Sequence, residues 1–395
     1  MLSESAAVTV RATLPAIGAH LDEITERFYA GLFTARPELL RDLFNRGNQA
    51  AGTQRQALAG SIAAFATHLL EHPESRPDAM LARIAHKHAS LGVTPEQYAL
   101  VHEHLFAAIA GVLGEAVTPE VAAAWDEVYW LMANALVAIE KRLYEESGEP
   151  GRRNWEVVER VAETADVVTF RLRPADGGPV ADFRAGQYVS VRAELPDGAR
   201  QIRQYSLSGA PGSTLRQISV KRVRDDGDAP DGEVSNHLHA RVREGDVLEL
   251  SAPYGDLVLD DAAGTPLLLA SAGIGVTPMV AMLARLAETG HRAPVTVVHG
   301  DRSPADHALR ADHEAYAGKL PDAAVHFWYE RDATPGARTG LVDLDAVDVV
   351  AGTRAYLCGP LPFMRAVRAQ LIDRGVAPAD IHYEVFGPDL WLSRA

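Results

Sequence analysis

The chain has 395 residues, of which 47% are hydrophobic and 23% are charged, and its formal net charge is −15. This length exceeds one ordinary domain and predicts two or three domains with the composition of a soluble globular protein. An acidic chain without a lysine- or arginine-rich stripe is not expected to bind nucleic acid or an anionic membrane.

The single cysteine, Cys358, cannot form an intrachain disulfide, as expected in a reducing cytosol. The N-terminal residues lack a basic region followed by an apolar signal core. No apolar run approaches the ~18–20 residues that span a bilayer. We therefore expect a cytoplasmic protein without a membrane span.

Residues 1–146 are predicted to be helical, because their apolar residues recur at steps of three and four. The segment TPEQ (94–97) has a capping threonine, a first-turn proline and a glutamine placed to close a capping box. A second helix start, TPE (118–120), precedes a last helix expected over about 121–145.

The segment SGEPG (147–151) predicts a linker, after which the apolar period changes to two. Six short strands without a long helix among them predict an antiparallel β-barrel, over residues 152–262. The predicted strands are WEVVERVAE (155–163), VVTFRLRP (167–174), QYVSVRAEL (187–195), RQYSLSG (203–209), RQISVKRV (216–223) and DVLELSAP (246–253). The segment DDGDAPDG (225–232) is expected to be a solvated acidic loop.

Over residues 263–395 strands and helices alternate, which predicts an α/β unit with an open parallel sheet. Helices are expected over about 277–288, 307–319 and 361–373. The predicted strands are PLLLAS (266–271), PVTVVHG (294–300), AVHFWYE (324–330), AYLC (355–358) and IHYEVF (381–386).

One histidine in the helical segment projects from an apolar face. His88 continues a stripe formed by Leu81, Ile84 and Ala85 at helical spacing, whereas His86 lies off that stripe. Such a histidine is either a hydrogen-bonded core residue or a metal ligand.

Two further residues favour the metal ligand. Tyr98 and Glu140 each stand on the apolar face of a later helix, and a buried carboxylate is costly unless it is paired. A histidine that donates to Glu140 satisfies both groups and becomes more electron-donating to a metal. Gln54 begins another apolar face, and Tyr29 and Phe44 are aromatic residues of the same segment.

The strand segment RQYSL (203–207) carries side chains suited to a flavin nucleotide. Arg203 suits a pyrophosphate, Tyr205 offers a ring that stacks on a heterocycle, and Ser206 suits the polar edge of a flavin. Together with Gln204, Tyr188 in GQY (186–188), and Val234 and Ser235 in GEVSN (232–236), these residues resemble the FAD-binding pieces of the ferredoxin–NADP⁺ reductase family.

A glycine turn, AGIGVTP (272–278), follows an apolar strand and opens a helix, as a pyrophosphate-binding loop does. The form GIGVTP, the turn CGP (358–360) and the terminal EVFGP (384–388) resemble the same reductase family. Cys358 suits either a role near a nicotinamide or a small buried apolar position. Val385 replaces the small residue that is frequent there, and DLWLSRA (389–395) extends the chain beyond the motif.

Residues 1–146 resemble the globin half of flavohaemoglobins. The segments that carry this resemblance are FYAGLF (28–33), PELLRDLFNRGNQ (37–49), TQRQALAGSIAAFA (53–66), IAHKHASLGVTPEQY (84–98) and the helix with Glu140. The resemblance implies that His88 is the proximal ligand of haem b, supported by Tyr98 and Glu140. It also implies that Tyr29 and Gln54 are distal polar groups, that Phe44 packs on the haem, and that Leu58 restricts the ligand site.

The resemblance extends to the reductase half. It assigns FAD to Tyr188, Arg203, Gln204, Tyr205, Ser206, Val234 and Ser235. It assigns NAD(P)H to Gly273, Gly275, Val276, Thr277, Pro278, Cys358, Gly359 and Pro360. It places Lys87, Glu384 and Phe386 at the haem–flavin junction.

The function that this resemblance implies is that of a nitric oxide dioxygenase, which converts NO and O₂ to nitrate at a haem re-reduced by NAD(P)H through FAD. Two alternatives are a globin that binds or senses O₂ or NO, and a general NAD(P)H-dependent reductase of hydroperoxides or other acceptors. We expect a monomer. Arg302 suits either a 2′-phosphate or solvent, which leaves NADH and NADPH open.

Overall fold

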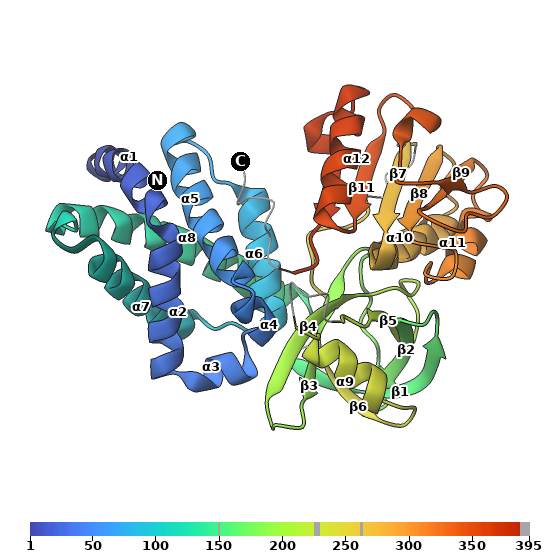
Figure 1. Ribbon diagram of the computed structural model, residues 1–395, viewed down its shortest axis with the longest axis horizontal. Coiled ribbons are helices and arrows are strands. Elements are labelled where there is room, and N and C mark those ends of the chain that lie inside the picture. Colours follow the sequence, from blue (N-terminus) through green and yellow to red (C-terminus); the bar gives the residue numbers. More distant parts are fainter. Residues whose placement is uncertain (149–150, 225–229, 261–263, 388–395) are drawn as a thin grey trace.

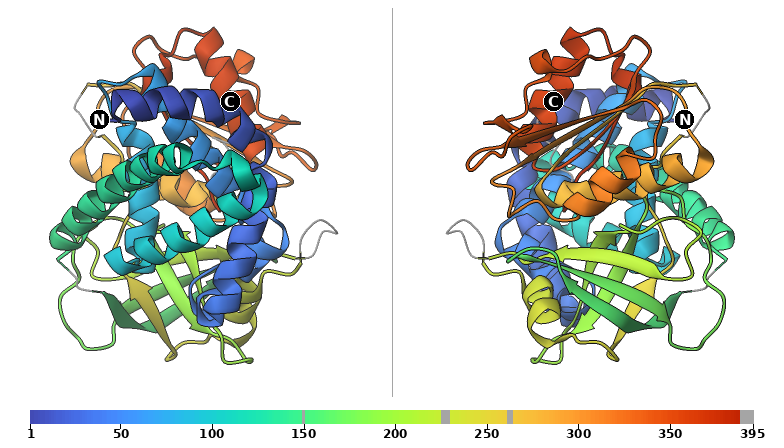
Figure 2. Two further views of the ribbon diagram at one scale, coloured as in Figure 1. Left: turned by 90° about the vertical axis from the view of Figure 1, so that its left-hand side faces the viewer. Right: turned by 90° about the vertical axis from the view of Figure 1, so that its right-hand side faces the viewer.

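The computed structural model describes residues 1–148, 151–224, 230–260 and 264–387. Its elements form a helical unit, an antiparallel sheet and a parallel sheet, in that chain order (Figure 1). Seen from the side, the parallel sheet lies above the antiparallel one, and the helical unit lies against both (Figure 2). The predicted fold class is confirmed.

The helical unit buries one apolar core, in which Phe28, Leu32, Phe65 and Leu81 are almost fully inaccessible. The predicted capping box between Thr94 and Gln97 is present. The described helices are α1 (Glu4–Ala19), α2 (Leu21–Ala35), α3 (Pro37–Asp42), α4 (Arg46–Ala50), α5 (Thr53–Glu71), α6 (Asp78–Leu91), α7 (Pro95–Leu113), the 3₁₀ turn η1 (Gly114–Ala116) and α8 (Pro119–Glu146).

Helix α7 and the turn η1 that follows it are rich in apolar residues. The stretch Pro95–Ala116 is long and apolar enough to cross a membrane by those two criteria alone. Three of its apolar residues, Leu105, Phe106 and Ile109, line an internal cavity of the helical unit.

The second unit is a six-stranded antiparallel sheet with the order β4-β3-β6-β1-β2-β5. An isolated bridge between Leu207 and Ile218 brings its two edge strands together. The strands are β1 (Arg152–Ala162), β2 (Val167–Pro174), β3 (Tyr188–Glu194), β4 (Arg200–Ser206), β5 (Arg216–Lys221) and β6 (Val247–Ser251), and α9 (Glu233–Arg241) lies between the last two. Strand β4 begins three residues before the predicted segment, because Arg200 pairs with Glu194 across a hairpin.

The third unit is a six-stranded parallel sheet with the order β10-β9-β8-β7-β11-β12. Helix α10 is buried along almost its whole length. The elements are β7 (Leu267–Ala272), the turn η2 (Gly273–Gly275), α10 (Val276–Thr289), β8 (Val295–Asp301), α11 (Arg310–Ala317), β9 (Ala323–Tyr329), β10 (Arg338–Thr339), the turn η3 (Leu344–Ala346), β11 (Arg354–Cys358), α12 (Leu361–Asp373), the turn η4 (Pro378–Asp380) and β12 (Ile381–Glu384). The two-residue strand β10 was not predicted.

Some predictions concern residues outside the described ones. The first five residues of the expected acidic loop (225–232), two linker residues (149–150) and the C-terminal extension (389–395) lie there. The domain limits at 146, 152, 262 and 263 stay predictions.

Candidate functional site

The helical unit contains a hydrogen-bonded group of three side chains from three helices. Nδ1 of His88 (α6) lies 2.9 Å from Oε1 of Glu140 (α8) and 2.9 Å from the hydroxyl of Tyr98 (α7). The Tyr98 hydroxyl donates to the same carboxylate oxygen at 2.5 Å. An ionised carboxylate only accepts, so His88 presents Nδ1–H to it and keeps a lone pair on Nε2. Burial and the Glu140 charge raise the pKa of Tyr98 above its usual range.

This arrangement fits a haem iron ligand. Glu140 is 2% exposed, whereas the side chain of His88 is 31% exposed, although α6 buries its neighbours Leu81 and Ala85 completely. Among the described residues no hydrogen bond engages Nε2 of His88. The imidazole therefore offers an available nitrogen whose ring is oriented by a carboxylate behind it, which is the usual outer support of a metal-bound histidine.

Tyr29, on α2, is buried in the same unit. Its ring contacts those of Phe33 and Phe44, with centroids 5.6 and 5.9 Å away. Burial raises the pKa of the Tyr29 phenol above its usual range, although the amides of Gln54 and Gln49 act in the opposite direction. The phenol therefore keeps its proton and can donate a hydrogen bond; its role as a distal group stays a prediction.

Gln49 was not identified from the sequence. Its amide lowers the pKa of the Tyr29 phenol, so it lies close to the same hydroxyl as Gln54, and its buried Nε2 has no hydrogen bond of ordinary geometry among the described residues. It lies on α4, a five-residue helix with no apolar period to mark it. Leu58 packs at the edge of the same core, partly buried.

An apolar cavity lies within this core. Its lining comes from α1, α2, α5, α7 and α8 and includes Ile24, Ile62, Leu105 and Trp125. A cavity lined this way stays dry and suits small uncharged molecules.

The C-terminal part of α6 joins the helical unit to both sheets. Nζ of Lys87 donates to the carbonyl of Gly387 at 2.9 Å. The backbone N–H of Gly255 donates to Nδ1 of His86 at 3.0 Å, so the histidine off the apolar stripe serves a domain contact. The Ser90, Ser190 and Gln204 side chains form a chain of hydrogen bonds, each 2.9 Å long. The flavin-motif strand is thus tied to the helix that carries His88.

The predicted flavin residues gather on β3 and β4. Arg203 is half-buried, and burial lowers its pKa. Its Nη1 donates to the carbonyl of Ile202 and to Oε1 of Gln201, and within the described part of the chain it forms no ion pair. A half-buried guanidinium without a carboxylate partner fits a phosphate ligand. Tyr205 and Ser206 follow on the same strand, and Tyr188 is buried on β3.

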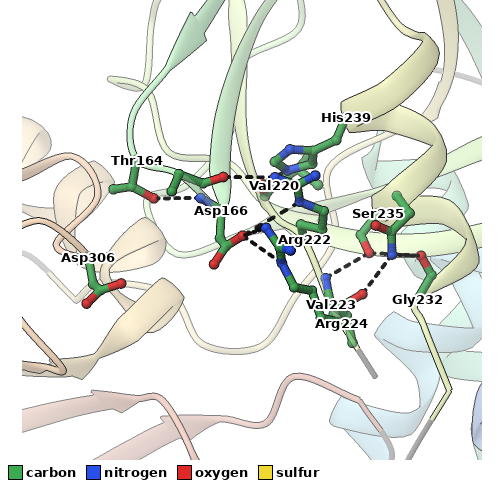
Figure 3. Close-up of polar contacts among 12 residues, drawn as sticks. Thr164, Asp166, Val220, Arg222, Val223, Arg224, Gly232, Ser235, His239 and Asp306 are labelled. Carbon is green, nitrogen blue, oxygen red and sulfur yellow. Dashed lines mark hydrogen bonds and ion pairs between the residues drawn. The ribbon is translucent and has the colours of Figure 1, made fainter. Parts of the chain in front are cut away.

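Val234 and Ser235 lie in the first turn of α9, as predicted. The Ser235 hydroxyl donates to the carbonyl of Gly232 at 3.1 Å and accepts from the backbone N–H of Val223 at 3.1 Å (Figure 3). The two arginines on either side of Val223 pair with Asp166, Arg224 at 2.8 Å and Arg222 at 3.6 Å (Figure 3).

The predicted nucleotide motifs meet at the carboxyl edge of the parallel sheet. A Cβ on Gly275 would lie 2.2 Å from the carbonyl oxygen of Cys358 and 2.8 Å from the nitrogen of Gly359, so the two loops touch through their backbones. Val276, Thr277 and Pro278 are buried in the first turn of α10, and Pro360 precedes α12. This edge is where open parallel sheets bind nucleotides.

Cys358 itself is fully buried in an apolar cluster, and burial raises the pKa of its thiol. Its side chain thus occupies the small apolar position that was one of its two expected roles. Glu384 pairs with Cys358 across β11 and β12 and is 8% exposed. Phe386 is 46% exposed, and Val385 packs on the neighbouring core.

A small pocket lies between the glycine loop and the antiparallel sheet. Its lining includes Gly273, Asp166, Lys221, Asp301 and Arg302. Arg302 pairs with Asp306 at 2.6 Å, and the Asp301 carboxylate is 6% exposed.

Three buried histidines, His299, His307 and His313, form a separate cluster in the parallel-sheet unit. One ring nitrogen of each lies within 4.8 Å of the others. The rings of His299 and His307 are stacked, with centroids 3.9 Å apart and planes 22° from parallel. A metal lies near the plane of each ligating imidazole at about 2.0–2.1 Å. Two stacked rings share no such point, so this arrangement does not fit an ion held by all three.

The helical unit has a histidine oriented by a buried carboxylate, and it is followed by an antiparallel sheet and a parallel sheet with nucleotide-binding motifs. Together these features define a globin-linked oxidoreductase of the flavin and nicotinamide class. The globin family matches residues 26–136, the "Oxidoreductase FAD-binding domain" family matches 154–259, and the "Oxidoreductase NAD-binding domain" family matches 269–369. The chain belongs to the flavohemoprotein family, also called flavohaemoglobins.

Similar proteins and solved structures support the assignment to this family. A flavohemoprotein of Rhizobium meliloti is 43% identical over 99% of this chain and 100% of its own length. A flavohemoglobin structure from Malassezia yamatoensis, with bound FAD and haem, is 39% identical with a TM-score of 0.91, covering 98% of this chain and 100% of that one. The FAD/NAD-binding domain of a Vibrio cholerae nitric oxide dioxygenase is 37% identical with a TM-score of 0.55, covering 60% of this chain and 99% of that one.

Proposed function

We propose that this protein is a nitric oxide dioxygenase, which converts NO and O₂ to nitrate at a haem that NAD(P)H re-reduces through FAD. The observation that carries the proposal is the contact of His88 with Glu140 and Tyr98, because a carboxylate behind the imidazole favours O₂ activation over simple storage. The Vibrio cholerae nitric oxide dioxygenase and the haem- and FAD-bound flavohemoglobin support it.

Haem supplies an O₂-binding iron that accepts single electrons, and FAD divides a hydride into single electrons. His88 holds the iron through Nε2, while Glu140 and Tyr98 fix the orientation of the imidazole. Tyr29 and Gln54 would offer hydrogen-bond donors to the diatomic substrates O₂ and NO. Phe44 packs on the macrocycle, and Leu58 narrows the space for the ligand.

In the reductase half Arg203 neutralises the flavin pyrophosphate, and the first turn of α9 at Val234 and Ser235 holds a phosphate. Tyr205 would offer its ring to the flavin, and Ser206 would offer its hydroxyl to the polar edge of the flavin. The remaining flavin residues are Tyr188 and Gln204. The glycine loop (273–278) and the CGP turn (358–360) receive the nicotinamide nucleotide, and Lys87, Glu384 and Phe386 lie between flavin and haem.

We further propose NADH as the donor, because Asp301, in the pocket beside Gly273, offers a carboxylate to ribose hydroxyls, and because Arg302, which could bind a 2′-phosphate, is paired with Asp306 at 2.6 Å. Each nitrate formed from one NO and one O₂ consumes one electron, so one NADH serves two turnovers. A monomeric state, a cytoplasmic location and domains at 1–146, 152–262 and 263–395 belong to the same proposal.

The deciding experiment measures NO consumption by the haem- and FAD-loaded protein in air, with NADH or NADPH, and assays nitrate. We expect rapid, O₂-dependent conversion of NO to nitrate, with two nitrates per NADH. Slow NO loss with unchanged NADH oxidation would contradict the proposal and leave a binding or sensing globin. His88→Ala, which removes the iron ligand, should abolish nitrate formation but leave NADH-dependent flavin reduction intact.

A further inference from the structure

Gln201, on β4, is fully buried. It binds the segment of the globin unit that joins α3 to α4 (residues 40–46), which we call the corner. Its Nε2 donates to the carbonyls of Leu40, Arg41 and Phe44, at 3.2, 2.9 and 3.1 Å. Its Oε1 accepts from the backbone N–H of Arg46 at 3.3 Å. The first two carbonyls end α3 and Arg46 begins α4, so one amide from the barrel satisfies backbone groups at both helix termini.

The same oxygen of Gln201 accepts a hydrogen bond from Arg203. Nη1 of Arg203 lies 3.1 Å from Oε1, and the two residues share a face of β4 because they are two apart. Arg203 is the guanidinium that the proposed function gives to the flavin pyrophosphate. Gln201 therefore lies between a flavin contact and the globin corner.

The corner held by Gln201 carries part of the distal wall. The ring of Phe44 contacts the ring of Tyr29, with centroids 5.9 Å apart. Gln49, on the helix that begins at Arg46, acts on the hydroxyl of Tyr29. Arg203 is thus linked to Tyr29 by direct contacts through Gln201 and Phe44. A second route runs from Gln201 through the short helix α4, which begins at Arg46.

We propose that Gln201 is a positioning residue that couples occupancy of the flavin pyrophosphate site to the haem pocket; this rests on the proposed function. A glutamine amide can turn about its last bond, and the orientation seen here needs a donor on Oε1 and acceptors on Nε2. A pyrophosphate that fixes Arg203 keeps a charged donor on Oε1, so Nε2 stays directed at the corner. If bound FAD strengthens haem binding by a certain factor, bound haem must strengthen FAD binding by the same factor.

Other contacts hold the same corner without touching Arg203. Arg200 donates from its backbone N–H and from Nη2 to Asp42, each at 3.1 Å. Arg46 binds Asp197 and Glu233, both at 2.7 Å. The Arg200–Asp42 pair is partly exposed and, within the described part of the chain, makes no contact with Arg203, so it attaches the two units independently of that residue. Glu233, in contrast, begins the helix whose first turn the proposed function gives to a flavin phosphate. Arg200 is thus a matched control, next to Gln201 on the same strand.

The test is the transfer of ferric haem from this protein to an excess of a haem-free acceptor globin, with FAD bound and after FAD removal. In the unmutated chain FAD should slow haem loss by about five-fold or more, the lower range of measured couplings. Gln201→Leu should bring the ratio of the two rates close to one, and Arg200→Gln should leave it unchanged. A merely structural role would speed haem loss equally in both states and preserve the ratio, which would overturn the proposal.

Amide hydrogen exchange over residues 37–50 provides a second measurement that needs no variant, should Gln201→Leu fail to fold. FAD should slow exchange in this segment of the haem-loaded protein, and equal exchange with and without FAD would overturn the coupling. A chain that binds no FAD would refute the proposed function and the coupling together. A chain that binds both cofactors, yet loses haem equally fast in both states, refutes the coupling alone.

Discussion

The carboxylate of Glu140 lies 2.9 Å from Nδ1 of His88, although the two residues are 52 positions apart. Glu140 is buried and also accepts from Tyr98, so both of its hydrogen-bond donors belong to this one group. The carboxylate makes the imidazole a stronger electron donor than a neutral partner would.

Glu140→Gln should therefore retain haem but shift its reduction potential to more positive values and lower turnover by about 10–100-fold. Spectroelectrochemical titration of the haem measures the potential. Glu145→Gln, an exposed position on the same helix, is the control and should change neither quantity. An unchanged potential in Glu140→Gln would show that the carboxylate does not tune the iron.

Tyr29→Phe should speed O₂ release from the reduced protein by about five-fold, because one hydrogen bond of about 1 kcal/mol is lost. Stopped-flow displacement of O₂ by CO gives the rate. Tyr144→Phe removes a hydroxyl that donates to the carbonyl of Val93 at 2.9 Å, so it should leave the rate unchanged. Equal rates in Tyr29→Phe and the unmutated protein would remove Tyr29 from the ligand site.

Gly275→Ala should slow flavin reduction by NADH and destabilise the protein by about 1–3 kcal/mol, as overpacking does. The backbone φ of Gly275 is −61°, so the effect is steric and not conformational. Stopped-flow flavin absorbance and thermal unfolding measure the two effects, and O₂ binding should not change. Gly18→Ala, with no atom within 4 Å of its added Cβ, should be neutral. Full reductase activity in Gly275→Ala would contradict the contact with Cys358.

The buried histidine cluster predicts a loss of stability in mild acid. Burial and the charge of His299 lower the pKa of His313 to about 3, below the unfolded value of about 6.5. Between about pH 3 and pH 6.5 the imidazole of His313 is therefore protonated in the unfolded chain and neutral in the folded protein. Stability is complete above about pH 6.5 and falls toward pH 3 by about 1.4 kcal/mol per pH unit per proton. Burial lowers the pKa of His307 in the same direction.

Urea unfolding at pH 5, 6 and 7 measures this slope. His313→Phe should reduce it by about one proton, because phenylalanine has nothing to titrate. His20→Gln, at an exposed position, should leave the slope as it is. A slope unaffected by His313→Phe would mean that this histidine is already protonated in the folded protein.

Much of the fold was predictable from contiguous residues. Apolar period separates helix from strand, and the TPEQ segment (94–97) contains both halves of its capping box. The glycine loop at 273–275 was correctly placed between a strand and a helix, because strand, turn and helix start follow one another along the chain. His88 could be singled out because its helix has a clear apolar stripe.

Tertiary structure alone decided which distant residues meet. Nothing in the sequence marks Gln201, although the motif RQYSL (203–207) follows it on the same strand, and its partners in the globin are more than 150 positions away. Gln49 lies on a helix too short to show a period, and the contact of Gly275 with Cys358 needs two loops to pack together. Local conformation is encoded in neighbouring residues, whereas contacts between domains depend on how whole units pack. The sequence by itself therefore determined the class of site, and the tertiary structure determined which distant residues contact it.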